Sequence, residues 1–202
     1  TSSVEHPAVT NTFLELEQLG FDVTFLPVDE NGRVRVADLK AAIRSDTTLI
    51  SIMAVNNEIG TIQPIQEIAE VLVDHPNINF HVDGVQALGK NLRDKIYHPR
   101  IDMMSFSGHK FHGPRGTGIL YKKASRQILP LIEGGGQEKN LRSGTENTPA
   151  IAAMAKALRI LKEDEAGKAQ RIQAIKTKIY NYLKDKPGIE IFSANNEIFS
   201  PH

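Results

Sequence analysis

Apolar residues recur along this chain in two alternating patterns, one at helical spacing and one in short β-branched runs. The helical spacing predicts helices that begin near Pro7, near Val36 and at Pro64. The short runs predict buried strands over residues 23–28, 48–55, 78–82 and 102–106. Because short strands alternate with helices, we expect an α/β fold built on a doubly wound, mostly parallel sheet.

One further strand is expected over residues 118–121, after a loop that contains glycine and proline. The link from the strand at 102–106 is too short for the helical crossover that parallel neighbours require. We therefore expect residues 118–121 to run antiparallel to that strand, within an otherwise parallel sheet.

The C-terminal part of the chain is typical of two helices followed by a new element. The first helix begins at Pro149, and the second carries apolar residues from Ile172 to Leu183. Helical spacing predicts that Met154 and Tyr182 pack in the core rather than contact a ligand. Residues 189–192 are predicted to form a strand. We thus divide the chain into a large domain (1–150), connecting helices (151–186) and the beginning of a small domain (187–202).

The composition excludes several classes of function. Lysine plus arginine and aspartate plus glutamate both number 24, so the formal net charge is zero and favours neither nucleic acid nor an anionic membrane as a partner. No apolar run is long enough to cross a bilayer. The chain has no cysteine, which excludes disulfides and thiolate metal sites and agrees with a reducing compartment. We expect a cytoplasmic protein, and an organellar matrix stays open.

Two titratable residues follow successive apolar runs. Lys110 lies among glycines and small polar residues, where partial desolvation would lower its pKa and free its amine as a nucleophile. Asp83 ends the preceding run. The carboxyl ends of neighbouring strands face one crevice, where ligands bind, and a lysine plus a carboxylate are what pyridoxal phosphate requires of a protein. The plainer alternatives are a surface lysine and a helix N-cap aspartate.

Other kinds of site have weaker support. His81, His109 and His112 could build a metal site, but no carboxylate falls at a recognised ligand spacing, so we expect no metal. The glycines at 113–118 and 134–136 match neither the P-loop nor the dinucleotide pattern. We therefore do not expect a nucleotide site.

Four motifs occur together in one order: Val-Asn-Asn-Glu-Ile-Gly (55–60), His-Val-Asp-Gly-Val-Gln (81–86), Ser-Phe-Ser-Gly-His-Lys (105–110) and Gly-Gly-Gly-Gln-Glu-Lys-Asn-Leu-Arg-Ser-Gly-Thr (134–145). In this combination the chain resembles a class I cysteine desulfurase of the aminotransferase class V type. The resemblance implies a fold-type I large domain with one antiparallel strand, pyridoxal 5'-phosphate as cofactor, and a homodimer. It also implies that L-cysteine becomes L-alanine, and that enzyme-bound persulfide sulfur passes to a scaffold protein for iron–sulfur clusters.

The resemblance also assigns roles to individual residues. Lys110 would hold the cofactor as a Schiff base and move protons, and Asp83 would pair with the pyridine nitrogen. Gln86 would contact the phenolic oxygen, and His6 would stack on the ring and act in acid–base steps. Asn57 would contact the ring and the substrate. The phosphate would bind Ser107, His109 and, from the partner subunit, Thr145. Each of these residues has a plainer alternative in a loop, a turn or a strand end, and the role of Arg142 stays open.

Two features depart from the family pattern. The family uses a cysteine nucleophile downstream of the lysine and a phosphate-binding loop near its N-terminus, and neither is present here. We therefore expect an internal fragment that is itself inactive. The alternatives are another fold-type I lyase or aminotransferase, such as a selenocysteine lyase, and a non-catalytic scaffold module. The segment 134–145 favours the desulfurase over the other enzymes.

Overall fold

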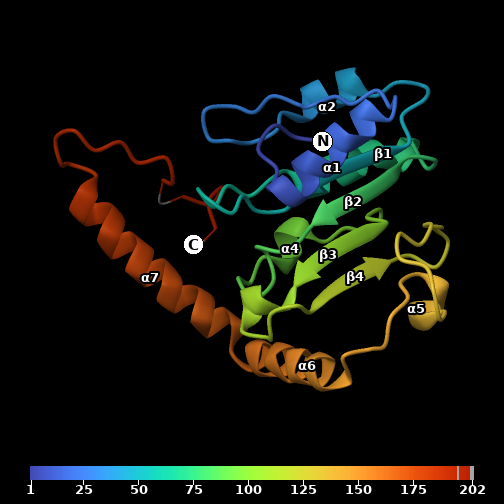
Figure 1. Cartoon of the computed structure of the whole chain (residues 1–202). Coiled ribbons are helices and arrows are strands. Elements are labelled where there is room, and N and C mark those ends of the chain that lie inside the picture. The colour runs from blue at the N-terminus through green and yellow to red at the C-terminus, as the bar shows by residue number, and fades with distance from the viewer. Residues whose placement is uncertain (195, 201–202) are drawn as a thin grey trace.

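The computed structural model describes residues 1–194 and 196–200, and it forms an α/β structure around one four-stranded sheet (Figure 1). The sheet is made of β1 (Leu49–Met53), β2 (Asn79–Asp83), β3 (Met103–Ser107) and β4 (Gly118–Lys122). The strands lie in the order β1-β2-β3-β4; the first two pairs are parallel and the last is antiparallel. The predicted mixed sheet with its antiparallel 118–121 strand is therefore confirmed.

Helices connect and flank these strands. They are α1 (Pro7–Gln18), α2 (Val36–Ala42), α3 (Ile65–Val71), α4 (Arg93–Ile96), α5 (Gln137–Asn140), α6 (Thr148–Glu163) and α7 (Glu165–Leu183), with 3₁₀ turns η1 (Leu72–Asp74) and η2 (Gly108–Phe111). Proline lies in the first turn of α1 and of α6, where its missing N–H costs no helical hydrogen bond. The helices predicted from periodicity are thus present, within a few residues at their ends.

The main core lies on one face of the sheet. Side chains alternate across a strand, so Phe80 and Val82 of β2 point into this core while His81 and Asp83 point to the other face. Phe80 and Val82 are fully buried, and Ile65 and Ile68 of α3 pack in the same cluster. A smaller cluster of Phe111, Met154 and Leu161 joins η2 to α6. These two clusters fix the strand ends and the turn that follows β3.

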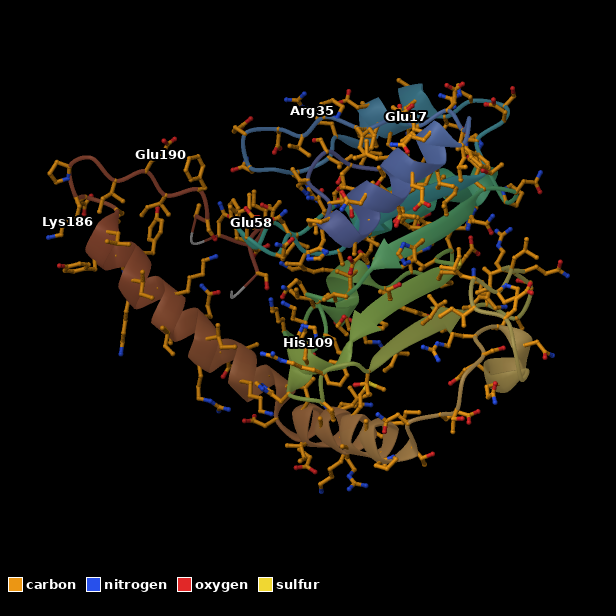
Figure 2. The ribbon with its side chains drawn as sticks, in the orientation of Figure 1. Glu17, Arg35, Glu58, His109, Lys186 and Glu190 are labelled. Atoms are coloured by element: carbon orange, nitrogen blue, oxygen red, sulfur yellow. The ribbon has the colours of Figure 1, made fainter. Side chains whose placement is uncertain are left out.

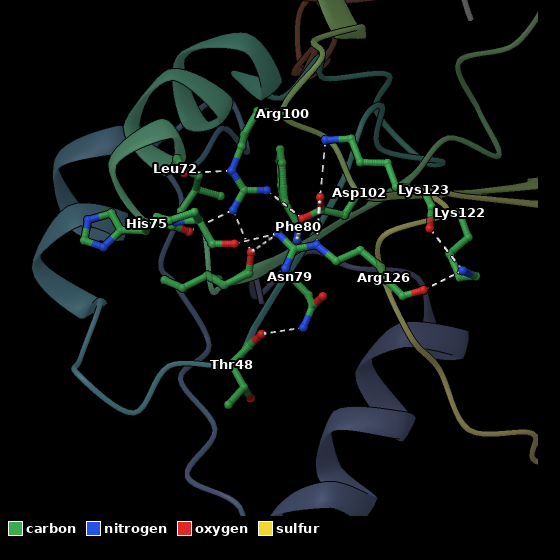
Figure 3. A network of polar contacts seen from close by, with 12 residues as sticks. Thr48, Leu72, His75, Asn79, Phe80, Arg100, Asp102, Lys122, Lys123 and Arg126 are labelled. Atoms are coloured by element: carbon green, nitrogen blue, oxygen red, sulfur yellow. Dashed lines mark hydrogen bonds and ion pairs between the residues drawn. The ribbon is translucent and has the colours of Figure 1, made fainter.

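A buried ion cluster fixes the amino-terminal end of β3 (Figure 3). Asp102 is 1% exposed, and its carboxylate accepts a hydrogen bond from the Phe80 N–H at 2.9 Å. Three cations surround it: Arg100 at 2.6 Å, Arg126 at 3.0 Å and Lys123 at 3.3 Å. Arg100 also donates to the carbonyls of Leu72, His75 and Ile78. The cluster therefore ties η1, β2, β3 and the chain after β4 to one carboxylate.

Three expectations about packing and strands are wrong. Residues 23–28 make only isolated bridges, at Leu26 and Val28, so no strand forms there. Residues 189–192 form no strand either, and Phe192 is 61% exposed. Met154 is buried as expected, but Tyr182 is 69% exposed because α7 runs away from the sheet (Figure 1). An amphipathic pattern specifies a helix face without specifying what covers it. The domain limits stay a prediction.

Candidate active site

The candidate residues gather where β1, β2 and β3 end, at the carboxyl edge of the parallel part of the sheet. Asp83 is the last residue of β2 and is in register with Met53 of β1 and Ser105 of β3. Ser107 ends β3, and His109 and Lys110 lie on η2 directly after it. Figure 2 shows His109 at the same end of the sheet as Glu58, the residue after Asn57. The parallel connections thus bring together residues that are far apart in sequence.

Asp83 is a buried carboxylate with spare hydrogen-bonding capacity. It is 9% exposed, and its Oδ1 atom accepts the Val85 N–H at 2.9 Å, which closes a turn rather than a helix. Among the described residues, nothing donates to its second oxygen. Gly84 follows because a Cβ there would lie 2.6 Å from the Phe106 ring. The sequence alternative of a helix N-cap is therefore wrong, and one oxygen of Asp83 stays available.

Glu5 is a second buried carboxylate beside Asp83, and sequence reasoning missed it. Its Oε1 atom accepts the Met53 N–H at 3.0 Å and the Ser2 hydroxyl at 2.5 Å, while its Oε2 atom is buried without a partner in the described structure. Burial raises the pKa of Glu5 to about 7, against the effect of those two hydrogen bonds, and the Asp83 charge adds to the rise. No local sequence pattern marks this residue.

His81 lies two residues before Asp83 on the same face of β2. Its ring nitrogens lie 2.8 Å from the hydroxyl oxygens of Ser51 and Ser105, one on each neighbouring strand. Burial lowers the pKa of His81, and the Asp83 charge opposes that shift. The ring therefore forms part of a polar contact across three strands. In the described part of the chain, no three His, Cys, Asp or Glu residues are arranged to hold a metal ion.

The turn η2 presents Lys110 and His109 outward. Phe111 is 2% exposed and packs with Met154 and Leu161, so the turn is fixed from below. A Cβ on Gly108 would overlap the Thr117 side chain, which explains the glycine before His109. Both His109 and Lys110 are exposed. The expectation that Lys110 is partly desolvated is therefore wrong for this chain alone, because Lys110 lies on the exposed side of η2.

A lysine of this site that burial does desolvate is Lys90, on the turn after β2. Burial lowers the pKa of Lys90 to about 8, and the Lys110 charge adds to this effect. The Lys90 Nζ atom lies 3.4 Å from Oε1 of Gln86, which is itself half-buried. The site therefore contains two neighbouring amines, Lys90 and Lys110, and an amide that contacts one of them.

His6 and Asn57 complete the cluster on the β1 side. His6 is exposed and caps α1, since its Nδ1 atom accepts the Ala8 N–H at 3.1 Å. It directly follows Glu5, which is bound to the end of β1. Asn57 is half-buried in the turn after β1, a turn that the Asn56 side chain holds through the N–H groups of Glu58 and Ile59. The structure thus places both residues near the end of β1, His6 at the N-cap of α1 and Asn57 in the turn after β1.

Thr145 is separate from this cluster. It is exposed, and no described hydrogen bond or ion pair joins it to the other candidate residues. It lies between α5 and α6, and Figure 1 shows α5 beside the end of β4, away from η2. The loop is internally bonded: the Gly144 N–H donates to Gln137 at 3.0 Å and the Ser143 N–H to Ile132 at 3.0 Å. One chain alone therefore does not bring Thr145 to Asp83 and Lys110.

A cavity of about 540 Å³ lies elsewhere, between α1, α2 and the start of β1. Its apolar lining includes Phe13, Phe21 and Leu39. Its charged lining residues pair with one another, since Arg44 contacts both Asp22 and Asp46. The cavity therefore offers less unpaired chemistry than the strand ends. No described helix is both long and apolar enough to span a membrane.

Comparison with known proteins gives a consistent result. The model of the aminotransferase class-V family matches residues 1–200. A NifS/IcsS protein homolog of Lactobacillus delbrueckii is 68% identical over 202 residues, which are all of this chain and 52% of that protein. A cysteine desulfurase IscS of Methanosarcina thermophila is 52% identical over 157 residues, covering 78% of this chain and 38% of that protein. This chain thus spans about half the length, or less, of these curated relatives.

Solved structures agree in fold. A NifS-like protein superposes with a TM-score of 0.92 at 40% identity, covering 99% of this chain and 54% of the other. A structure described as SspA in complex with cysteine superposes with a TM-score of 0.76 at 42% identity, covering 90% of this chain and 51% of the other. The sheet and the helices around the candidate site are therefore those of this structural group.

Proposed function

The chain belongs to the aminotransferase class-V family, and from this premise we propose that it forms the cofactor-binding part of a cysteine desulfurase. The reaction of the whole protein would take L-cysteine to L-alanine and pass the sulfur on. One observation carries the proposal. Asp83 and the Lys110 turn follow adjacent parallel strands, so a carboxylate and an amine converge at one edge of the sheet.

The residues at this edge fit pyridoxal 5'-phosphate. Asp83 has an oxygen to which no described residue donates, Lys110 offers an exposed amine, and Gln86 offers amide N–H groups that no described residue accepts. Ser107 and His109 lie just before Lys110 and would bind the phosphate. When bound, the cofactor supplies an electron sink for negative charge at the substrate α-carbon. The set contains the lysine and the carboxylate that this cofactor requires of a protein.

The chain's own residues would orient the cofactor ring and the substrate, and would hold or move protons on them. Asp83, a buried carboxylate, would hold a proton on the pyridine nitrogen with the oxygen that does not accept the Val85 N–H. Lys110 would bind the cofactor through Nζ and then move a proton at the substrate α-carbon. His6, on the cap of α1, would cover the ring and exchange protons at its imidazole. Asn57 would orient substrate and ring from the turn after β1.

The sulfur step needs a group that these 202 residues lack. A thiolate must attack the substrate sulfur and carry the persulfide, and no other side chain holds sulfane sulfur in this way. The sequence contains no cysteine. We therefore propose that residues 1–202 provide the cofactor site and that this chain by itself releases no sulfide from cysteine.

L-cysteine and a second copy of the chain are the partners we propose. The solved relative that contains cysteine supports the substrate. The position of Thr145, outside the cluster of its own chain, is consistent with a role in a partner's site. A scaffold protein would accept the sulfur.

Reductive trapping tests the proposal. We would mix the 202-residue chain with pyridoxal phosphate, reduce it with borohydride and locate the label by peptide mass spectrometry. The expected label is on Lys110, and Lys110→Ala should abolish it. The matched control is Lys178→Ala, at an exposed lysine of α7, and it should leave the label unchanged.

Two outcomes would overturn the proposal. One is a label on Lys90 or on scattered surface lysines in place of Lys110. The other is sulfide release by the 202-residue chain, supplied with cofactor, cysteine and a reductant, above a control with cofactor alone.

A further inference from the structure

Lys90 is a half-buried lysine for which the proposed mechanism has no use. We propose that Lys90 is a positioning residue that holds the carbonyl of the Gln86 side chain and thereby turns the Gln86 amide N–H groups toward an anionic oxygen. The inference rests on the proposed function in one respect, because that oxygen would be the phenolic oxygen of pyridoxal phosphate. The Lys90–Gln86 contact itself belongs to the chain without any ligand.

The direction of the contact follows from the chemistry of the two groups. A lysine ammonium has three donors and no acceptor, and a glutamine amide has one carbonyl oxygen and one NH₂ group. Only the carbonyl oxygen can therefore face Lys90, and Oε1 lies 3.4 Å from Nζ. Since the amide is planar, its two N–H groups then point away from Lys90. Among the described residues, nothing accepts them, so they are available to a ligand.

The backbone that carries both residues is fixed. Residues 85–91 form a turn in which the Ala87 N–H donates to the Gly84 carbonyl at 2.9 Å, and Ala87 is 2% exposed. Gly89 approaches Leu161 of α6 so closely that a Cβ would lie 2.8 Å from it. The backbones of Gln86 and Lys90 therefore keep their separation unless the packing between the turn and α6 moves.

Charge decides when the contact holds. The charged groups on the elements packed beside the turn are Lys110 of η2 and Glu165 of α7, which accepts the Asn91 N–H at 3.1 Å. With a pKa of about 8, the Lys90 amine is mostly protonated at neutral pH and becomes neutral in mildly alkaline solution. Loss of the proton weakens the donor, so the Gln86 amide should lose its fixed orientation there.

The first test uses the 202-residue chain without cofactor. The side-chain NH₂ signals of Gln86 are assigned by their loss in Gln86→Ala and followed by ¹H–¹⁵N NMR across the titration of Lys90. We expect them to shift with that titration in the wild type, and not in Lys90→Met. The matched control Lys178→Met, at an exposed lysine of α7, should titrate like the wild type. Signals that do not titrate, or that still titrate in Lys90→Met, would overturn the proposal.

The second test measures pyridoxal phosphate affinity in a double-mutant cycle. Lys90→Met should weaken binding about tenfold, and Gln86→Ala by a similar factor. Because Lys90 acts through Gln86, Lys90→Met should have almost no further effect in the Gln86→Ala background. Lys90→Arg, which keeps a cationic donor, should restore most of the affinity. Additive losses would mean that Lys90 contacts the ligand itself, and would overturn the proposal.

The two tests separate the two possible failures. Absence of any pyridoxal phosphate binding to wild type and variants alike would count against the proposed function, and the NMR titration would still decide the role of Lys90. Normal binding that depends on Lys110 but not on Lys90 would uphold the proposed function and reject the positioning role.

Discussion

Asp102 and Asp83 are both buried aspartates of the same sheet, but they lie at opposite ends of it and differ in their partners. Asp102, before β3, accepts the Phe80 N–H and is surrounded by Arg100, Lys123 and Arg126 (Figure 3). Burial acts to raise the pKa of Asp102, but hydrogen bonds from Phe80, Arg126 and Arg100 outweigh it and the pKa is lowered. Asp83 has one backbone donor.

The difference separates a charge that holds the fold from a charge that is kept for a ligand. At Asp102 every neighbouring element contributes a donor, so the ion is compensated without any external group. At Asp83 the neighbouring charged group is another carboxylate, Glu5, whose pKa burial and Asp83 raise to about 7. An uncompensated buried carboxylate lowers stability, and it is expected where a cationic group of a ligand is to be bound. Groups with a perturbed pKa, as Glu5 has, concentrate at functional sites.

The largest expected effect is a loss of stability when the charge of Asp102 is removed. Asp102→Asn would leave three cations around a neutral amide, and removing one partner of a buried ion cluster costs about 3–5 kcal/mol. Urea unfolding should show this loss in the free energy of unfolding. The matched control is Asp164→Asn, whose carboxylate pairs with Arg171 at the surface and should matter little. A stable, unchanged Asp102→Asn chain would contradict the structural role.

The next largest effect is a pH dependence of stability that Glu5 causes at the Asp83 end of the sheet. Because the pKa of Glu5 is raised from 4.5 to about 7 on folding, the folded state keeps its proton longer than the unfolded state. Stability should be fully present below pH 4.5 and fall as pH rises through 7, by roughly 3 kcal/mol relative to Glu5→Gln. Unfolding curves of both chains between pH 4 and pH 8 measure this. Parallel pH profiles would show that Glu5 does not retain its proton.

Asp83→Asn should separate function from stability. Asn keeps the acceptor for the Val85 N–H and removes the repulsion with Glu5, so the free energy of unfolding should change by less than about 1 kcal/mol. Catalysis should fall by orders of magnitude, because the charge opposite the pyridine nitrogen is lost. Turnover would be measured in a chimera in which residues 1–202 replace the matching residues of the L. delbrueckii relative. Near-normal turnover, or a stability loss like that of Asp102→Asn, would remove the contrast between the two aspartates.

The smallest effect concerns Thr145, which belongs neither to the Asp102 cluster nor to the group of residues around Asp83. In the same chimera, Thr145→Ala should weaken cofactor retention about fivefold, the worth of one hydrogen bond. Dialysis followed by absorbance of the retained cofactor measures it. The effect should require a dimer, so sedimentation analysis must accompany it. An active monomer that retains cofactor would exclude a shared site.

Much of the fold and part of the site could be predicted from the sequence. The antiparallel strand at 118–121 follows from a short link, and the convergence of Asp83 with Lys110 follows from the strand-end rule. Glu5 and Lys90 could not be found this way, because their importance comes from burial beside residues distant in sequence. The exposure of Lys110 and Tyr182 was likewise hidden, since periodicity does not say which segment covers a surface.

The sequence by itself determined the alternation of strands and helices in the sheet region, the antiparallel direction of the strand at 118–121 and the types of residue at the strand ends. These depend on local spacing and on short connections, which a one-dimensional pattern records. The tertiary structure alone decided how each charge is compensated. Three cations surround Asp102. Burial outweighs the hydrogen bonds and the N-terminal ammonium at Glu5. Lys90 contacts the carbonyl of Gln86. The physical reason is that solvation and Coulomb energies depend on distance in space and on burial.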